Sequence, residues 1–225
     1  MAETVRRRRA DGARTYEMIL REAADVASVE GLGGLTIGYL SGRLGLSKSG
    51  LFTHFGSKEE LQLATIEAAK LRYVSRVLQP ALSAPRGIAR LRALCEQVLD
   101  YMARPEFPGG CFFCVVGAEF HARPGAIREA IMQNRHYKCE ALAKLAAEAQ
   151  ALGELSSEVE PEQLAFELES VLDAANWSDT AQNRERDLEH ARRAVSKMLT
   201  LALPRRTRET PALRRRNASK RRSGK

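Results

Sequence analysis

Helical spacing of the apolar residues is the feature that most limits what this chain can fold into. Apolar side chains recur every three or four positions along almost its whole length, and no segment alternates apolar and polar residues as a half-buried strand does. Glycine and proline interrupt the pattern at intervals, as they do between helices. The sequence therefore predicts an all-α protein of about nine helices, over residues 16–30, 36–44, 47–55, 57–79, 87–104, 110–122, 125–152, 161–178 and 184–203.

Several residues mark the expected helix ends. Gly31 and Gly45 follow helical segments and suit a terminus, because glycine adopts positive φ readily. Pro80 is expected to end the fourth helix. At the start of that helix, Ser57 and Glu60 have the spacing of a capping box, in which each side chain accepts a hydrogen bond from the other residue's backbone N–H.

The lengths and positions of the apolar segments argue against a membrane-spanning or secreted chain. Hydrophobic residues make up 44% of the 225 residues, which is enough to bury a core. The longest apolar run, residues 111–118, is far shorter than the roughly 18 residues of a spanning helix. The basic residues 6–9 are not followed by the apolar region of a signal peptide, so we expect a cytoplasmic protein.

The net charge of +8 is unevenly distributed. Residues 1–14 carry +3 and residues 204–225 carry +9, which leaves −4 for residues 15–203. Basic segments of this kind are either solvated flexible tails or contacts for a polyanion such as DNA, and the charge alone does not separate the two.

Residues 44–61, LGLSKSGLFTHFGSKEEL, contain the strongest functional signal. Together with the helix predicted before it, the short helix over 47–55 has the arrangement of a helix-turn-helix. Its first turn places hydroxyl, ammonium and glycine groups where they suit a DNA groove. The residues expected to form the small core behind it are Leu35, Ile37, Leu40, Leu44, Leu46, Leu51 and Phe55.

The segment LTIGYLSGRLGLSKSGLFTHFGSKEEL resembles the DNA-binding domain of the tetracycline-repressor (TetR/AcrR) family over residues 15–66. The family often has tyrosine where this chain has Phe52, which lacks the hydroxyl that reaches a phosphate, so Phe52 is expected to have a packing role only. The DNA-contacting positions that the resemblance implies are Thr36, Ser47, Lys48, Ser49, Gly50, Phe52, Thr53, His54 and Lys58.

The resemblance also implies a small-molecule effector and a homodimer. We expect no cofactor and no metal. The expected regions are a basic arm (1–14), the helix-turn-helix domain (15–60), an effector-binding and dimerisation domain (61–203) and a disordered basic tail (204–225). The expected effector pocket contains Tyr101, Phe112, Phe113, Val116, Phe120, Met132 and Trp177. The expected dimer interface contains Leu164, Leu168, Val171, Leu172, Ala175, Val195, Met198 and Leu199 on the last two helices.

The leading interpretation is a transcriptional regulator, most often a repressor, that is not an enzyme and that an effector releases from a palindromic operator. One alternative is a nucleoid protein that binds DNA without sequence preference through its tails. A second is a thiol-based sensor or oxidoreductase that uses Cys111 and Cys114, whose spacing places both on one helix face. No βαβ pattern surrounds these cysteines, and no further ligand spacing accompanies them.

Overall fold

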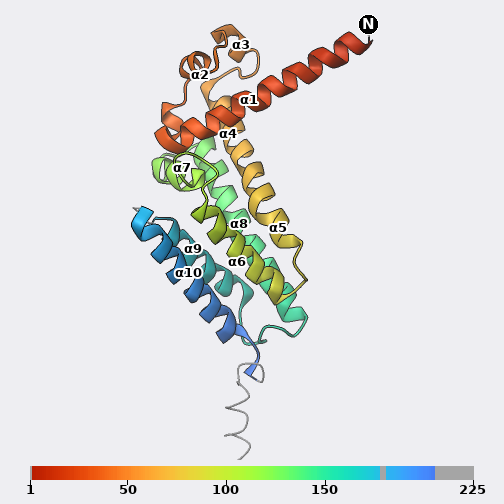
Figure 1. Cartoon of the computed structure of the whole chain (residues 1–225), viewed down its shortest axis with the longest axis vertical. Coiled ribbons are helices and arrows are strands. Elements are labelled where there is room, and N and C mark those ends of the chain that lie inside the picture. The colour runs from red at the N-terminus through yellow and green to blue at the C-terminus, as the bar shows by residue number, and fades with distance from the viewer. Residues whose placement is uncertain (1, 178–180, 206–225) are drawn as a thin grey trace, which may run out of the picture. The chain divides into compact units, whose positions relative to one another are not determined.

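The computed structural model describes residues 2–177 and 181–205, and these residues form helices and no strand (Figure 1). The predicted all-α class is confirmed. The chain folds into two compact units. The first unit contains residues 1–76 and 104–137, and the second contains residues 77–103 and 138–225.

The first unit starts with α1 (Ala2–Gly34), whose backbone is helical from Ala2 onward, so the expected N-terminal arm continues this helix. Gly31 has φ 75° and ψ 169°, which interrupts the helix at the predicted position. The short turn after it, residues 31–34, is called the glycine turn below. Next in this unit come α2 (Ile37–Leu44) and α3 (Lys48–Phe52).

Two side chains and one glycine fix the helix-turn-helix. Thr36 caps α2 by accepting a hydrogen bond from Tyr39 N at 3.1 Å, and Ser47 caps α3 by accepting one from Gly50 N at 3.0 Å. Gly45 closes α2 with φ 64°, as its sequence position predicted. The predicted core residues Leu35, Ile37, Leu40, Leu51 and Phe55 are buried, whereas Leu44 and Leu46 are half-buried.

The predicted fourth helix is longer than expected, because Pro80 does not end it. The chain continues from α4 (Lys58–Tyr73) through a π-helical turn, η1 (Val74–Leu78), into α5 (Gln79–Leu82). Proline breaks a helix interior because it lacks an N–H and crowds the preceding turn. Here Pro80 lies in the first turn of α5, where the N–H groups need no intrahelical acceptor, and the π-turn before it accommodates the change.

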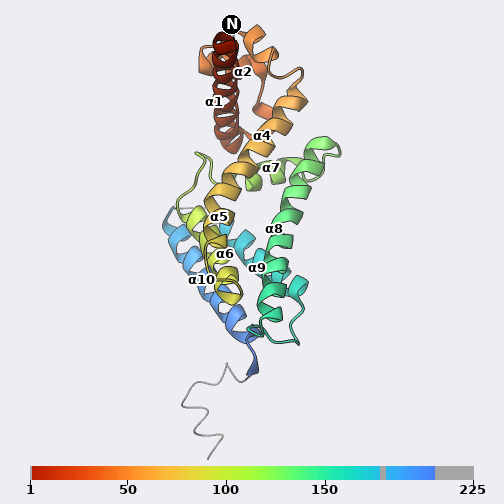
Figure 2. The same cartoon turned by 90° about the vertical axis from the view of Figure 1, so that its right-hand side faces the viewer.

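The first unit also contains α7 (Phe112–Phe120) and the first part of α8 (Ala126–Ala151). The second unit consists of α5, α6 (Ile88–Ala103), the rest of α8, α9 (Pro161–Asn176) and α10 (Ala181–Ala202). Helix α10 packs against both α6 and α9, which Figures 1 and 2 show side by side. None of the helices in the described residues is long and apolar enough to cross a membrane.

Candidate nucleic-acid interface

The N-terminal turn of α3 is an exposed polar surface. Ser47, Lys48 and Ser49 are exposed, and the two serine hydroxyl oxygens lie 3.2 Å apart. A Cβ atom added at Gly50 would lie 3.0 Å from Ser47 Oγ, so a larger residue would crowd the cap. Lys48 lies over α2, where its Cε would be 3.5 Å from a Cβ at Gly38. Hydroxyl donors, an ammonium and a helix N-terminus therefore face solvent together.

The end of α3 adds an aromatic group to this surface. Phe52 is 54% exposed, so it does not have the packing role expected from the sequence. The helix is short enough that Phe52 lies in its last turn and projects away from the small core. Thr53, also exposed, donates a hydrogen bond from Oγ1 to Gly50 O at 2.5 Å. Thr36 is exposed as well, and its hydroxyl is the cap of α2.

His54 lies within an aromatic cluster at the edge of this surface. Its ring centroid is 6.0 Å from that of Tyr16 on α1 and 6.3 Å from that of Phe55, and the rings of Tyr16 and Phe55 stack at 5.2 Å. The side chain is half-buried. His54 therefore supports the position of α3 against α1, and its remaining exposed part is available for a contact.

Lys58 and the cap of α4 lie close to the glycine turn. Lys58 Nζ donates a hydrogen bond to Gly33 O at 2.6 Å while its side chain stays exposed. At the cap, Ser57 Oγ accepts from Glu60 N at 3.1 Å, as predicted. Glu60 accepts from Gly56 N at 3.0 Å rather than from Ser57 N, so the second half of the predicted capping box is shifted by one residue.

Glu119 of α7 holds the glycine turn, a contact that the sequence did not predict. Its carboxylate accepts hydrogen bonds from Leu32 N at 2.7 Å and from Gly33 N at 2.9 Å. A Cβ at Gly31 or Gly33 would lie 2.4 or 2.5 Å from a carboxylate oxygen, so a larger residue at either position would displace the Glu119 carboxylate from the turn. On the other side of the turn, Gln62 Nε2 donates to Leu32 O at 2.6 Å. The three glycines among residues 31–34 were the only sequence signal for this site.

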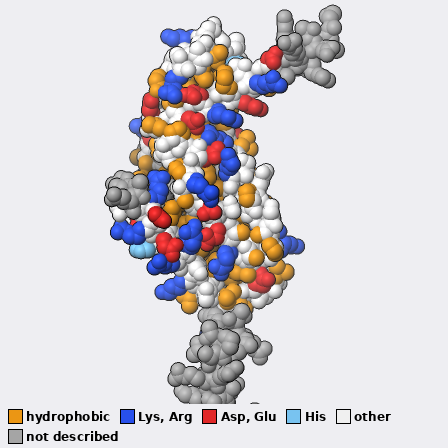
Figure 3. Space-filling view, viewed as in Figure 1, with side chains coloured by type: hydrophobic (Ala, Val, Ile, Leu, Met, Phe, Trp, Pro, Cys, Tyr) orange, Lys and Arg blue, Asp and Glu red, His pale blue; other side chains and the backbone are white. Residues whose placement is uncertain are grey.

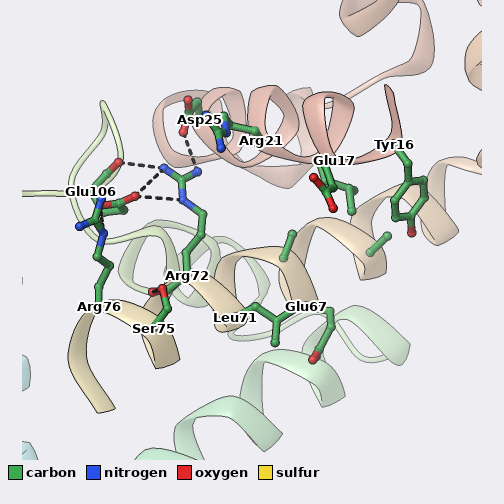
Figure 4. A pocket seen from close by; sticks show the side chains of 13 residues that line it. Tyr16, Glu17, Arg21, Asp25, Glu67, Leu71, Arg72, Ser75, Arg76 and Glu106 are labelled. Atoms are coloured by element: carbon green, nitrogen blue, oxygen red, sulfur yellow. Dashed lines mark hydrogen bonds and ion pairs between the residues drawn. The ribbon is translucent and has the colours of Figure 1, made fainter. Parts of the chain in front are cut away.

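A second set of charges connects α1 and α4 with the loop before α7. Arg72 binds Asp25 at 3.0 Å and Glu106 at 3.3 Å, and its guanidinium lies 4.0 Å from the ring centroid of Phe107. Arg76 binds the same Glu106 at 3.1 Å. The four charged residues border an open groove of about 1110 Å³ between α1 and α4, shown in Figure 4. Since Arg72 joins three segments of the first unit, it fixes their mutual position.

The residues of the predicted effector pocket belong to both units. On α7, Phe112 and Val116 are fully buried, and the ring centroid of Phe112 lies 5.7 Å from that of Phe107 and 5.2 Å from that of Phe113. Phe113, Phe120 and Met132 are half-buried in the same unit. Tyr101 is buried in the second unit, whereas Trp177, also there, is 65% exposed at the end of α9.

The predicted dimer residues are mostly part of the core of a single chain. Leu164, Leu168, Leu172, Ala175, Val195 and Leu199 are all buried in the second unit, and Val171 and Met198 are half-buried. A side chain that is already buried has almost no surface to lose against a second chain. The apolar pattern was read correctly as two faces, but these faces pack within the subunit. The exposed apolar residues of the two helices are Phe166, Trp177 and Leu201.

The two cysteines of the thiol hypothesis lie together at the start of α7. Cys111 is the N-cap of α7 and Cys114 lies in its first turn, both half-buried, and no disulfide involves either in the described structure. In the described part of the chain, no group of three or more His, Cys, Asp or Glu side chains could hold a metal ion. Burial raises the pKa of the Cys95 thiol to about 12, so it remains a thiol at neutral pH.

An exposed polar helix start on a packed three-helix frame, followed by a larger helical region, defines a DNA-binding protein of the helix-turn-helix class. Residues 19–65 match the family described as "Bacterial regulatory proteins, tetR family", and residues 87–195 match "Tetracyclin repressor-like, C-terminal domain". The chain belongs to the TetR family of ligand-responsive transcriptional regulators.

Individual relatives agree with this family. The transcriptional regulator AcuR of Cereibacter sphaeroides is 28% identical over 157 residues, which cover 69% of this chain and 71% of AcuR. A TetR regulator of Chloroflexus aurantiacus superimposes with a TM-score of 0.79 at 25% identity, over 86% of this chain and 98% of that one. The structure of AibR with isovaleryl coenzyme A and operator DNA gives a TM-score of 0.62 at 20% identity, over 84% and 98% of the two chains.

Proposed function

We propose that this protein is a repressor that binds a palindromic operator as a homodimer and leaves it when a small-molecule effector binds. The observation that carries the proposal is the exposed first turn of α3, with Ser47, Lys48 and Ser49 side by side on a buried frame. In a helix-turn-helix dimer, two such turns enter the major groove about 34–36 Å apart. A palindromic site then matches the two-fold symmetry of the protein.

The proposal is tested by a footprint on the DNA upstream of the protein's own gene, followed by competition with bulk DNA. A sequence-specific repressor is expected to prefer its operator by at least roughly a thousandfold. Equal affinity for operator and scrambled DNA would instead favour the nucleoid-protein alternative.

We expect the lysines of α3 and α4 to have different roles, with Lys48 in sequence recognition and Lys58 in contact with DNA phosphates. Lys48→Ala removes a group from the recognition turn, so operator affinity should fall by about 1–3 kcal/mol and sequence preference should relax. Lys58→Ala removes a contact with the DNA phosphates, so it should lower the affinity for all DNA sequences alike and reduce the salt dependence of binding. Lys70→Ala is a suitable control, because this α4 lysine pairs with Glu67 at 3.2 Å. An equal loss of specificity from Lys48→Ala and Lys58→Ala would contradict the assignment.

For the effector, we propose a site on the buried aromatic side of α7 and a transmission path through Glu119. The path is short, because the helix that carries Phe112 and Val116 also carries the carboxylate that holds the glycine turn. The glycine turn connects α1 to α2, so a movement of α7 would change how the helix-turn-helix, α2 and α3, is held. An effector that prefers the moved conformation shifts the population away from DNA binding.

This path predicts the behaviour of Glu119→Gln. The amide replaces one carboxylate acceptor by a donor that faces an N–H group, so the glycine turn should loosen at a cost of about 1–3 kcal/mol. The backbone amides of Leu32 and Gly33 should lose protection from hydrogen exchange, and operator affinity should fall without a change in α3. Glu129→Gln, at an exposed carboxylate in the first turn of α8, serves as the control. Unchanged protection at Leu32 and Gly33 would refute the role of Glu119.

For the dimer, we propose the outer face of α9 and α10 rather than the buried faces. Phe166 is 62% exposed, Trp177 is 65% exposed and Leu201 is 56% exposed, which is unusual for large apolar side chains. On the side of the molecule drawn in Figure 3, basic and acidic side chains lie close together over α10, with scattered apolar ones between them. Such a mixture suits an interface with an apolar centre and a polar rim.

A further inference from the structure

One buried polar side chain of the first unit has no partner for either of its functional atoms. Asn134 on α8 is 3% exposed, and neither its Nδ2 nor its Oδ1 makes a hydrogen bond. Glu169 Oε1 also lacks a hydrogen bond but lies 3.1 Å from Lys138 Nζ, so its charge is compensated. Among the side chains that the structure describes, only Asn134 leaves a buried donor and a buried acceptor both unpaired.

The neighbours of Asn134 on α8 place it at the interior side of that helix. Ile131, one turn earlier, approaches α7, where a Cβ at Gly117 would lie 4.0 Å from its Cγ2. Tyr137, one turn later, lies beside α4, with Lys70 Nζ 5.8 Å from its ring centroid. Positions 131 and 137 are each neighbours of position 134 on the helix surface, one on either side of it. Asn134 therefore lies on the face of α8 that contacts α7 on one side and α4 on the other.

An unpaired buried amide is costly, because both groups have lost their water and gained nothing in exchange. An unpaired buried group of this kind calls for an explanation, and a partner supplied by a ligand is one. The position suits a ligand site, since α7 contributes fully buried Phe112 and Val116 to the same unit and transmits to the glycine turn through Glu119. This inference rests on the effector response proposed above.

We propose that Asn134 is the polar anchor of the effector site and that the effector class is an uncharged carboxamide with an apolar remainder. A primary amide offers one donor and one acceptor side by side, so it forms two hydrogen bonds with the asparagine amide. A carboxylate would leave Oδ1 unpaired and would bury a charge that Asn134 cannot compensate. A purely apolar molecule would satisfy neither atom.

The amide of Asn134 is closed to water in this conformation. Ligand binding therefore requires a conformational change, and this change couples ligand binding to DNA binding. Neither amide atom of Asn134 is accessible, so a ligand reaches it only when the helices packed around it separate locally. The ligand is then stabilised by the pairing of Asn134 in the opened form alone. This differential affinity is what an effector needs in order to shift the population.

The test uses the full-length protein, thermal unfolding and operator binding, with isobutyramide and benzamide as probes at millimolar concentration. N,N-dimethylbenzamide is the matched compound, because it keeps the acceptor and the ring but has no donor. Asn134→Leu keeps the branched shape and removes both polar atoms. Gln133→Leu is the control variant, since this amide is exposed on the same helix.

We expect Asn134→Leu to raise the unfolding midpoint by roughly 2–8 °C and to leave operator binding intact, while Gln133→Leu does neither. A primary amide should raise the midpoint of the unmodified protein and weaken operator binding by roughly 5- to 150-fold. The dimethyl compound should have no effect, and Asn134→Leu should respond to no probe.

Three results would overturn the inference. They are a midpoint of Asn134→Leu well below that of the unmodified protein, a response to primary amides that Asn134→Leu retains, and no response of the unmodified protein to either primary amide. A thermal response that depends on Asn134, with operator affinity unchanged, would support the anchor and contradict the proposed effector response. The two proposals therefore fail separately.

Discussion

Leu168→Asp is expected to unfold the second unit, whereas Phe166→Asp is expected to leave the fold intact and to separate the dimer. Leu168 is 0% exposed, so the aspartate would bury an unpaired charge and remove an apolar side chain from the core. Each effect costs several kcal/mol, and together they approach the total stability of about 5–15 kcal/mol of a typical domain. Phe166, two residues earlier on the same helix, is 62% exposed, so its replacement costs the subunit fold little.

The two variants are compared by circular dichroism and by sedimentation. Leu168→Asp should lose helical signal, and its thermal unfolding midpoint should fall well below that of the unmodified protein. Phe166→Asp should keep the helical signal and unfold as a folded single subunit does. It should sediment as a monomer and bind operator weakly, because a monomer has one α3 helix and makes half the DNA contacts. A folded, monomeric Leu168→Asp would restore the buried face as the dimer interface. A full-strength dimer of Phe166→Asp would place the interface elsewhere.

Removal of the basic tail after Leu203 is expected to weaken operator and scrambled DNA binding together, by orders of magnitude at low salt. Residues 204–225 carry ten Lys or Arg against one acid, while residues 15–203 carry a net charge of −4. Each phosphate that a cation neutralises contributes about 0.9 to the slope of log affinity against log salt. Proteins with 6–10 such contacts lose roughly 10³–10⁵ in affinity between 50 and 200 mM salt. All of the tail after residue 205 lies outside the described residues, so this prediction rests on charge alone.

A salt titration of both DNAs measures this effect. The truncated protein should keep its fold, its dimer and its ratio of operator to scrambled affinity, with a shallower slope for each DNA. A full-length variant in which the tail arginines become lysines keeps the charge and should keep the slope. Identical slopes with and without the tail would make it a solubilising segment, and loss of operator preference alone would mean that it reads sequence.

Most of the helix-turn-helix could be predicted from the sequence, because its determinants are close together in the chain. Thr36, Ser47 and Ser57 cap helices through hydrogen bonds that span three residues, and Gly45 ends a helix through its own φ angle. The small core follows from apolar spacing over about twenty residues. Here local propensity, capping and burial agree, so each supports the others. The exposure of Phe52 was the exception, because α3 ends earlier than its apolar spacing suggested.

Contacts between distant segments could not be predicted in this way. Glu119 reaches Leu32 across 87 residues, and nothing near either residue in the chain announces the pair. Arg72 likewise joins Asp25 and Glu106, 47 residues before it and 34 after it. The sequence shows which residues carry charge, but which charges meet depends on how the helices pack.

By itself, the sequence determined the helical class, the helix-turn-helix with the glycine that ends its first helix, and the family, since these depend on spacing along one segment. Only the tertiary structure decided which side of each amphipathic helix is inside. On α9 the stripe through Leu164, Leu168 and Leu172 satisfies an internal core and a dimer seam equally well in sequence, and its burial within one chain assigns it to the core. The physical reason is that an apolar face specifies that it must be covered but not by which partner.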